Sequence, residues 1–197
     1  MTYRSCRLRT VGRAALAALI TSAAGAAACS DTLGIPTNHV NADQAFTVYA
    51  LSGTDLGAPA GMFFATRTVV RVDGSFQFDL AFDINSQGNA VILPVGQVGT
   101  PVGGAPMIGL QRVPKAYGDL TEAPRTGYVF DSSMVVRPGG TLAIQAQSVM
   151  CMGYMAPYIF AKITVDSVNV PARAIHGHAL INSNCGSRQL TPGVPRF

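Results

Sequence analysis

The sequence predicts an all-β fold in which two antiparallel sheets pack face to face, a β-sandwich that is Ig-like in general architecture. Charged residues make up only 12% of the chain, whereas glycine and proline are abundant, with 21 and 12 copies. Short segments rich in β-branched residues recur between turn signals. Sparse charge, frequent turns and about eight or nine short strands are typical of a sandwich, and a small β-barrel is the alternative.

The strongest pattern lies in residues 66–85, where the sequence predicts a hairpin that forms a wall of the core. The second strand alternates strictly and places one apolar row on a single side: Phe76, Phe78, Leu80, Phe82 and Ile84. A two-residue turn at the Asp-Gly pair would set charges on that apolar side. A three-residue turn instead places Arg67 and Arg71 on the polar side, near Asp79 and Asp83. We therefore expect the longer turn, with cross-strand ion pairs between these side chains.

Further strands are expected between turn signals, over residues 46–51, 90–94, 107–113, 127–130, 133–136, 141–149, 158–168 and 173–181. In the segment 158–168 apolar residues alternate with an outward-facing polar row: Lys162, Thr164 and Asp166. The polar connector 115–124 can carry one helical turn. We find no internal repeat.

The first 28 residues have the composition of an export leader. Four arginines lie within the first 13 residues, and an uncharged run rich in alanine and leucine follows from Ala14 to Ala28. This run is shorter than the roughly 20 apolar residues that a membrane-spanning helix needs. Without the four arginines of the leader, the chain has 10 basic residues instead of 14, and these balance its 10 acidic residues. The net charge of +4 therefore does not indicate nucleic-acid binding.

The leader ends with Ala27 and Ala28 directly before Cys29. Small residues before a cysteine resemble the lipobox of bacterial lipoprotein precursors. The resemblance implies that Cys29 is lipidated and becomes the mature N-terminus in the cell envelope, and Ser30 in place of an aspartate points to the outer membrane. Ordinary cleavage after Ala28, which would leave a plain thiol, is the alternative. The expected organisation is a signal peptide over 1–28, a lipidated tether over 29–43, a sandwich domain over 44–192 and a tail over 193–197.

Two cysteines remain once Cys6 is assigned to the leader and Cys29 to the lipid. Cys151 and Cys185 would then reach an oxidising compartment, where paired thiols persist as disulfides. The sequence predicts a structural disulfide between them, closing 33 intervening residues and worth about 3–4 kcal/mol. Two separate thiols are the alternative, and no Cys-x-x-Cys spacing indicates redox chemistry.

Two histidines form one candidate metal site. His176 and His178 lie two apart on an expected strand, so both imidazoles leave the same face and can chelate zinc or copper. Asp166 or His39 would have to supply a third ligand. The plainer interpretation is a pair of surface histidines on an edge hairpin, and we expect no metal.

Methionines crowd around residue 151. Met150, Met152 and Met155 offer soft sulfur ligands beside Cys151, and such ligands select Cu(I). Methionine is also a common filler of irregular core gaps, and a disulfide would remove the strongest ligand. We therefore expect neither copper nor any other cofactor.

Motifs of the common catalytic sites are absent from the sequence. It contains no Gly-x-Ser-x-Gly elbow, no phosphate-binding loop and no Asp-x-Asp-x-Asp-Gly calcium loop. The best carboxylate pair, Asp79 and Asp83, would lie about 13 Å apart on one strand. Glycosidase carboxylates lie roughly 5–9.5 Å apart, so this pair does not predict glycoside hydrolysis.

We therefore expect a non-catalytic binding or structural domain of the envelope. Its partners would be the membrane, through the N-terminal lipid, and an unknown envelope protein or glycan, with no nucleic acid. The loops 52–61 and 95–106, rich in glycine and proline, are the candidates for recognition. The alternatives are a metal-binding envelope protein that uses His176 and His178, and a hydrolase whose site the sequence does not reveal.

Overall fold

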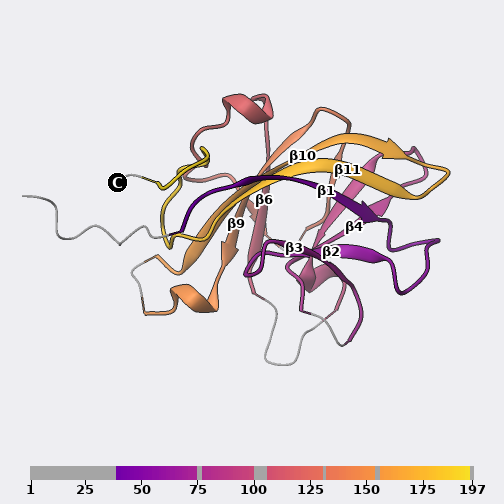
Figure 1. Cartoon of the computed structure of the whole chain (residues 1–197), viewed down its shortest axis with the longest axis horizontal. Helices are drawn as coiled ribbons and strands as arrows, with labels where there is room; N and C mark the ends of the chain where they lie inside the picture. Colours follow the sequence, from indigo (N-terminus) through magenta and orange to yellow (C-terminus); the bar gives the residue numbers. More distant parts are fainter. Residues whose placement is uncertain (1–38, 75–76, 100–105, 131, 154–155, 196–197) are drawn as a thin grey trace, which may run out of the picture. The chain divides into compact units, whose positions relative to one another are not determined.

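The computed structural model describes residues 39–74, 77–99, 106–130, 132–153 and 156–195. These residues form two antiparallel sheets, of six and five strands, around a shared apolar core (Figure 1). The sheets do not close into a barrel, so the predicted sandwich is confirmed and the barrel alternative is wrong. Helical structure in these ranges is limited to three short 3-10 turns, and no helix there is long and apolar enough to cross a bilayer.

The larger sheet has the strand order β1-β11-β10-β9-β6-β7, and the smaller sheet has the order β3-β2-β4-β5-β8. The strands of the larger sheet are β1 (Asp43–Tyr49), β11 (Ala174–Asn182), β10 (Tyr158–Asn169), β9 (Thr141–Gln147), β6 (Ile108–Val113) and β7 (Val129–Phe130). Those of the smaller sheet are β3 (Thr68–Arg71), β2 (Pro59–Phe63), β4 (Leu80–Ile84), β5 (Ala90–Pro94) and β8 (Met134–Val136). The 3-10 turns are η1 (Val95–Gln97), η2 (Tyr117–Asp119) and η3 (Val149–Cys151).

The core between the sheets is built from alternating apolar rows. The row predicted on β4 is buried at Leu80, Phe82 and Ile84. The rings of Phe46 on β1 and Phe82 on β4 lie 5.6 Å apart, centroid to centroid, and so join one sheet to the other. Each square ångström of apolar surface removed from water contributes about 25 cal/mol, so this interior is the main source of stability.

The predicted pairing within residues 66–85 is wrong. β3 and β4 do not pair with each other, because β2 lies between them and pairs with both. β2 contains Pro59 and Gly61, which sequence patterns assign to a loop. β3 is therefore an edge strand with mostly exposed side chains, whereas β4 forms the predicted wall of the core.

The predicted ion pairs across that hairpin are also wrong, since β2 separates the two strands. Arg71 pairs with Asp73 at 3.4 Å, and Asp83 pairs with Arg173 from the β10–β11 turn at 3.0 Å. Arg67 donates to a backbone carbonyl and a hydroxyl from other parts of the domain. The Arg71–Asp73 pair is local, whereas the contacts of Arg67 and Asp83 connect the smaller sheet to segments of the larger one.

A second apolar cluster covers the outer face of the larger sheet. The connector that contains η2 and the C-terminal segment contribute to it, and its buried members are Val113, Leu120, Ala123, Ala143, Phe160, Leu180 and Leu190. Lys162 and Thr164 lie on this outer side but are only 3% and 6% exposed. The predicted direction of these side chains is right and their predicted exposure to solvent is wrong.

Candidate functional site

His176 and His178 lie on the outer face of β11, and each imidazole has one polar partner. Nδ1 of His176 lies 2.9 Å from Oγ1 of Thr47 on β1. Nδ1 of His178 lies 2.7 Å from Oδ2 of Asp166 on β10. The structure therefore brings Asp166 to one of the two histidines, as the sequence suggested for a third ligand.

The other suggested ligand, His39, lies far from this pair. The backbone N–H of His39 donates to Oδ1 of Asn184, which lies beyond the end of β11. The four strand residues that lead from His178 to Asn182 alone span roughly 13 Å. Among the described residues, no group of three His, Cys, Asp or Glu side chains is placed to hold a metal ion. Asp166 orients one imidazole, as the outer shell of a metal site does, without completing a ligand set.

The same contacts do not build a hydrolase triad. A triad needs one imidazole placed between a hydroxyl and a carboxylate. Here the hydroxyl of Thr47 meets His176, whereas the carboxylate of Asp166 meets His178, so the two contacts fall on different rings. No histidine within the described ranges joins both groups.

A buried lysine fastens the connector to the same face. Nζ of Lys162 donates to the carbonyls of Tyr117 and Leu120, at 2.8 and 3.0 Å, and lies 4.4 Å from the centroid of the Tyr117 ring. Burial lowers the pKa of Lys162, and the charge of Asp43 opposes this shift. The hydroxyl of Tyr117 donates to Oδ1 of Asp43 at 3.0 Å, and burial together with this carboxylate raises the pKa of the tyrosine. The amine of Lys162 and the carboxylate of Asp43 therefore hold η2 against the larger sheet through their contacts with Tyr117 and Leu120.

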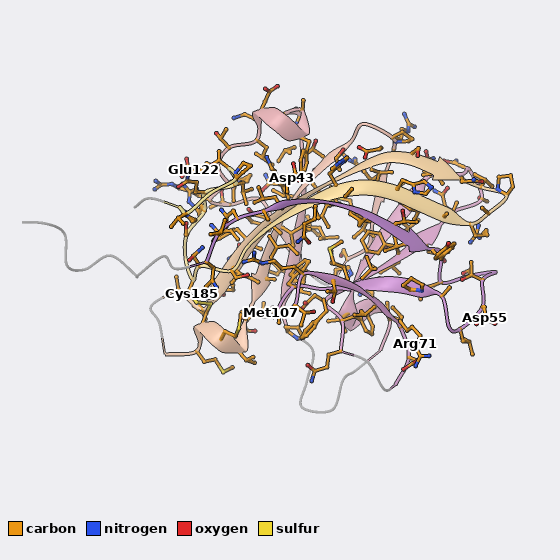
Figure 2. The ribbon with its side chains drawn as sticks, viewed as in Figure 1. Asp43, Asp55, Arg71, Met107, Glu122 and Cys185 are labelled. Atoms are coloured by element: carbon orange, nitrogen blue, oxygen red, sulfur yellow. A yellow bond between two sulfur atoms is a disulfide. The ribbon has the colours of Figure 1, made fainter. Side chains whose placement is uncertain are left out.

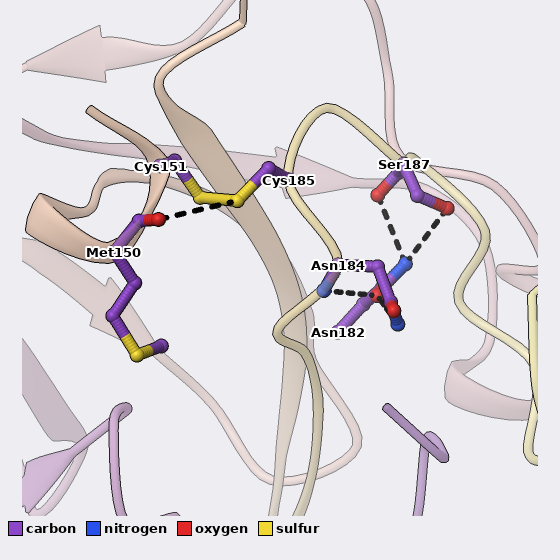
Figure 3. The surroundings of a disulfide bond; sticks show 6 residues. All are labelled: Met150, Cys151, Asn182, Asn184, Cys185 and Ser187. Atoms are coloured by element: carbon purple, nitrogen blue, oxygen red, sulfur yellow. Dashed lines mark hydrogen bonds between the residues drawn. A yellow bond between two sulfur atoms is a disulfide. The ribbon is translucent and has the colours of Figure 1, made fainter. Parts of the chain in front are cut away.

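The predicted disulfide is confirmed. Cys151 in η3 is bonded to Cys185 after β11, with their Cα atoms 5.5 Å apart (Figure 3). Met150 and Met152, the methionines that flank Cys151 in sequence, are 49% and 64% exposed. Since Cys151 is oxidised, the thiolate that would be the strongest copper ligand is missing.

Buried amides next to the disulfide hold both the entering chain and the C-terminal segment. Nδ2 of Asn182 donates to the carbonyl and the hydroxyl of Ser187, at 2.9 and 3.1 Å (Figure 3). Asn184 exchanges two hydrogen bonds with the backbone of His39, at 3.0 and 2.8 Å. The chain therefore enters the domain beside the Cys151–Cys185 bond.

A cavity of about 170 Å³ opens where β1 faces the edge of the smaller sheet. Phe46, Met62 and Ile181 are its large apolar lining residues, and Arg67 is its charged one. None of the described residues that line it is a carboxylate or an imidazole, the usual general acids and bases.

The remaining predicted sites lie partly outside the described residues. Cys29 and the whole leader are outside them. The loop predicted over 52–61 is shortened to 52–58, because its last three residues belong to β2. The loop 95–106 begins with η1, and its residues 100–105 are outside the described ranges.

Asp79 is buried, although the sequence places it on the polar side of its strand. It is 8% exposed, and its Oδ2 accepts a hydrogen bond of 2.6 Å from the backbone N–H of Phe64. Burial raises the pKa of Asp79 to about 6, and the bond from Phe64 opposes the shift. The carboxylate thus ties the turn after β2 to the start of β4.

We expect the stability of the domain to fall as the pH rises through 6. The folded pKa of about 6 exceeds the ordinary value of 3.8, so the folded state binds the proton more tightly. The stabilisation is complete below the ordinary pKa, declines between the two pKa values and is fully lost once the pH has risen through the folded value, with a total of about 3 kcal/mol. Urea unfolding from pH 4 to 7 measures it. Asp79→Asn should abolish the decline, and the exposed control Asp55→Asn should keep it; a decline that survives in Asp79→Asn contradicts the assignment.

Sequence patterns identified the two histidines, Asp166 and the disulfide, but missed the cluster around Lys162. The available signal was one lysine between apolar neighbours on a predicted strand, which is also the pattern of an ordinary solvent-facing position. Comparisons of the chain with protein-family models, with curated proteins and with solved structures found no match.

Proposed function

We propose that the protein is a lipid-anchored β-sandwich of the bacterial cell envelope that acts as a non-catalytic binding or structural module. The observation that carries the proposal is the Cys151–Cys185 disulfide. Disulfides persist in oxidising compartments outside the cytosol, which agrees with a basic and then apolar leader that ends directly before Cys29. The lipid on Cys29 would hold the domain at the outer membrane.

The arrangement of the polar side chains supports a role in binding or structure. The charged groups Lys162, Asp79 and Asp83 are each engaged in contacts that connect one element of the fold to another. The loop 52–58 presents Leu56 at 84% exposure, as a recognition loop at one end of a sandwich can. The proposed partner is another envelope protein or a glycan.

Replacing Cys29 with serine is expected to abolish lipid attachment. Cells grown with radiolabelled palmitate should label the wild-type protein, which should sediment with outer membranes, whereas Cys29→Ser should carry no label. Cys6→Ser is the matched control, because this cysteine lies in the leader and the variant should remain labelled. An unlabelled wild-type protein, or a labelled Cys29→Ser variant, would refute the anchor.

A further inference from the structure

Several apolar side chains at and near η3 are exposed. Four residues make up this surface, which we call the η3 patch: Met107, Val149, Met150 and Met152. Their exposed fractions are 46%, 78%, 49% and 64% in that order. Met107 belongs to the same end of β9, because its carbonyl accepts a hydrogen bond of 2.9 Å from the N–H of Gln147. Exposed apolar side chains that gather at one place are typical of a surface that meets a partner or a membrane.

The η3 patch lies at the end of the domain where the chain enters. His39, the first described residue, is hydrogen-bonded to Asn184, which precedes Cys185, and Cys185 is bonded to Cys151 inside η3. Two further exposed valines flank the entry: Val40 at 54%, and Val194 at 50% beside the bridge between residues 41 and 193. The loop that contains Asp55 lies at the opposite end of the domain (Figure 2).

The segments that build the η3 patch carry no charged side chains. The sequence has no Asp, Glu, Lys or Arg from residue 138 to 161, or from 84 to 111. A surface that meets a water-soluble partner usually has a polar rim, whereas segments without charged side chains can rest against the apolar part of a lipid interface without burying a charge. Methionine side chains are flexible and polarisable, so they adapt to a partner with no fixed shape.

The length of chain ahead of His39 limits where the η3 patch can be. Nine residues lie between Cys29 and His39, and the ten chain steps that join the two span at most about 35 Å when fully extended. A lipid on Cys29 therefore keeps His39 within about 35 Å of the bilayer. We propose that the η3 patch rests on the surface of the lipid bilayer that holds the anchor, an inference that depends on the proposed lipidation of Cys29.

The chain contains no tryptophan, so a single introduced one reports on its own surroundings. We would place it at Met152→Trp in the patch and, as the matched control, at the exposed Leu56→Trp in the opposite loop. Each full-length variant is expressed with its leader, purified with its lipid and reconstituted into vesicles of phosphatidylethanolamine and phosphatidylglycerol, with and without brominated acyl chains. Flotation and palmitate content are read on the same samples.

The expected result is a loss of fluorescence and a shift to shorter wavelength for Met152→Trp in brominated vesicles, with no change for Leu56→Trp. Adding Val149→Asp to Met152→Trp should reverse the quenching while flotation persists. Palmitate-bearing protein that floats but shows equal emission from both positions would overturn the bilayer contact and leave the anchor intact. Protein without palmitate that fails to float would overturn both. If the emission of Met152→Trp shifts to shorter wavelength in native membranes but not in vesicles of pure lipid, a membrane protein covers the η3 patch, and the lipid assignment is overturned.

Discussion

Removing the disulfide with Cys151→Ser and Cys185→Ser is expected to lower the free energy of unfolding by about 3–4 kcal/mol. The bond closes a segment 34 residues long in sequence separation, which includes all of β10 and β11. Without it the unfolded chain regains the entropy of that loop. Cys151 is also fully buried, so a serine hydroxyl there adds the cost of an unpaired polar group.

Urea unfolding of the oxidised and the reduced protein measures this effect. The alanine pair, Cys151→Ala with Cys185→Ala, is the matched control because it breaks the bond without burying a hydroxyl, and it should lose less than the serine pair. Reduction of the wild-type protein should reproduce most of the loss. An unfolding curve that does not move on reduction would contradict the prediction.

Phe82→Ala is expected to lower the free energy of unfolding by about 3–5 kcal/mol, as large aromatic deletions in cores do. The ring of Phe82 has no exposed surface and packs against Phe46 of the opposite sheet. Its removal leaves a cavity at the contact between the two sheets, and close packing limits how far the surroundings can collapse into it.

Denaturant unfolding of the purified variant tests this, with Phe82→Leu as the conservative control and Val129→Ala as the surface control. Phe82→Leu should retain much of the stability because it keeps most of the apolar volume. Val129 is 49% exposed, so its truncation should change stability by less than about 0.5 kcal/mol. Equal losses at the core and surface positions would show that the inter-sheet contact does not dominate.

Hydrophobic alternation predicted the fold class well because the sequence of each half-buried strand shows by itself which of its two faces is apolar. The rows on β4, β10 and β11 are buried as their patterns indicate. Alternation contains no information on which strand lies next to which. The strand β2, with Pro59 and Gly61 in five residues, lacks the pattern altogether. It nevertheless separates β3 from β4, and the predicted hairpin failed for that reason.

The same limit explains the candidate site. The spacing of His176 and His178 fixes their common face, but their partners come from β1 and β10, which only the tertiary structure identifies. Cys151 and Cys185 were predictable because the number of cysteines left few ways to pair them. The burial of Lys162 depends on the connector that packs across the sheet. Its acceptor in that connector, the carbonyl of Leu120, lies 42 residues away in sequence.

The shielding of that lysine has a practical consequence. The whole chain has two lysines, Lys115 and Lys162. Lys115 is exposed on the connector, whereas the second amine is enclosed beneath Tyr117. Amine-directed dyes or cross-linkers applied to the native domain therefore have one side-chain target, Lys115. Attachment through this residue would immobilise the domain in a defined orientation.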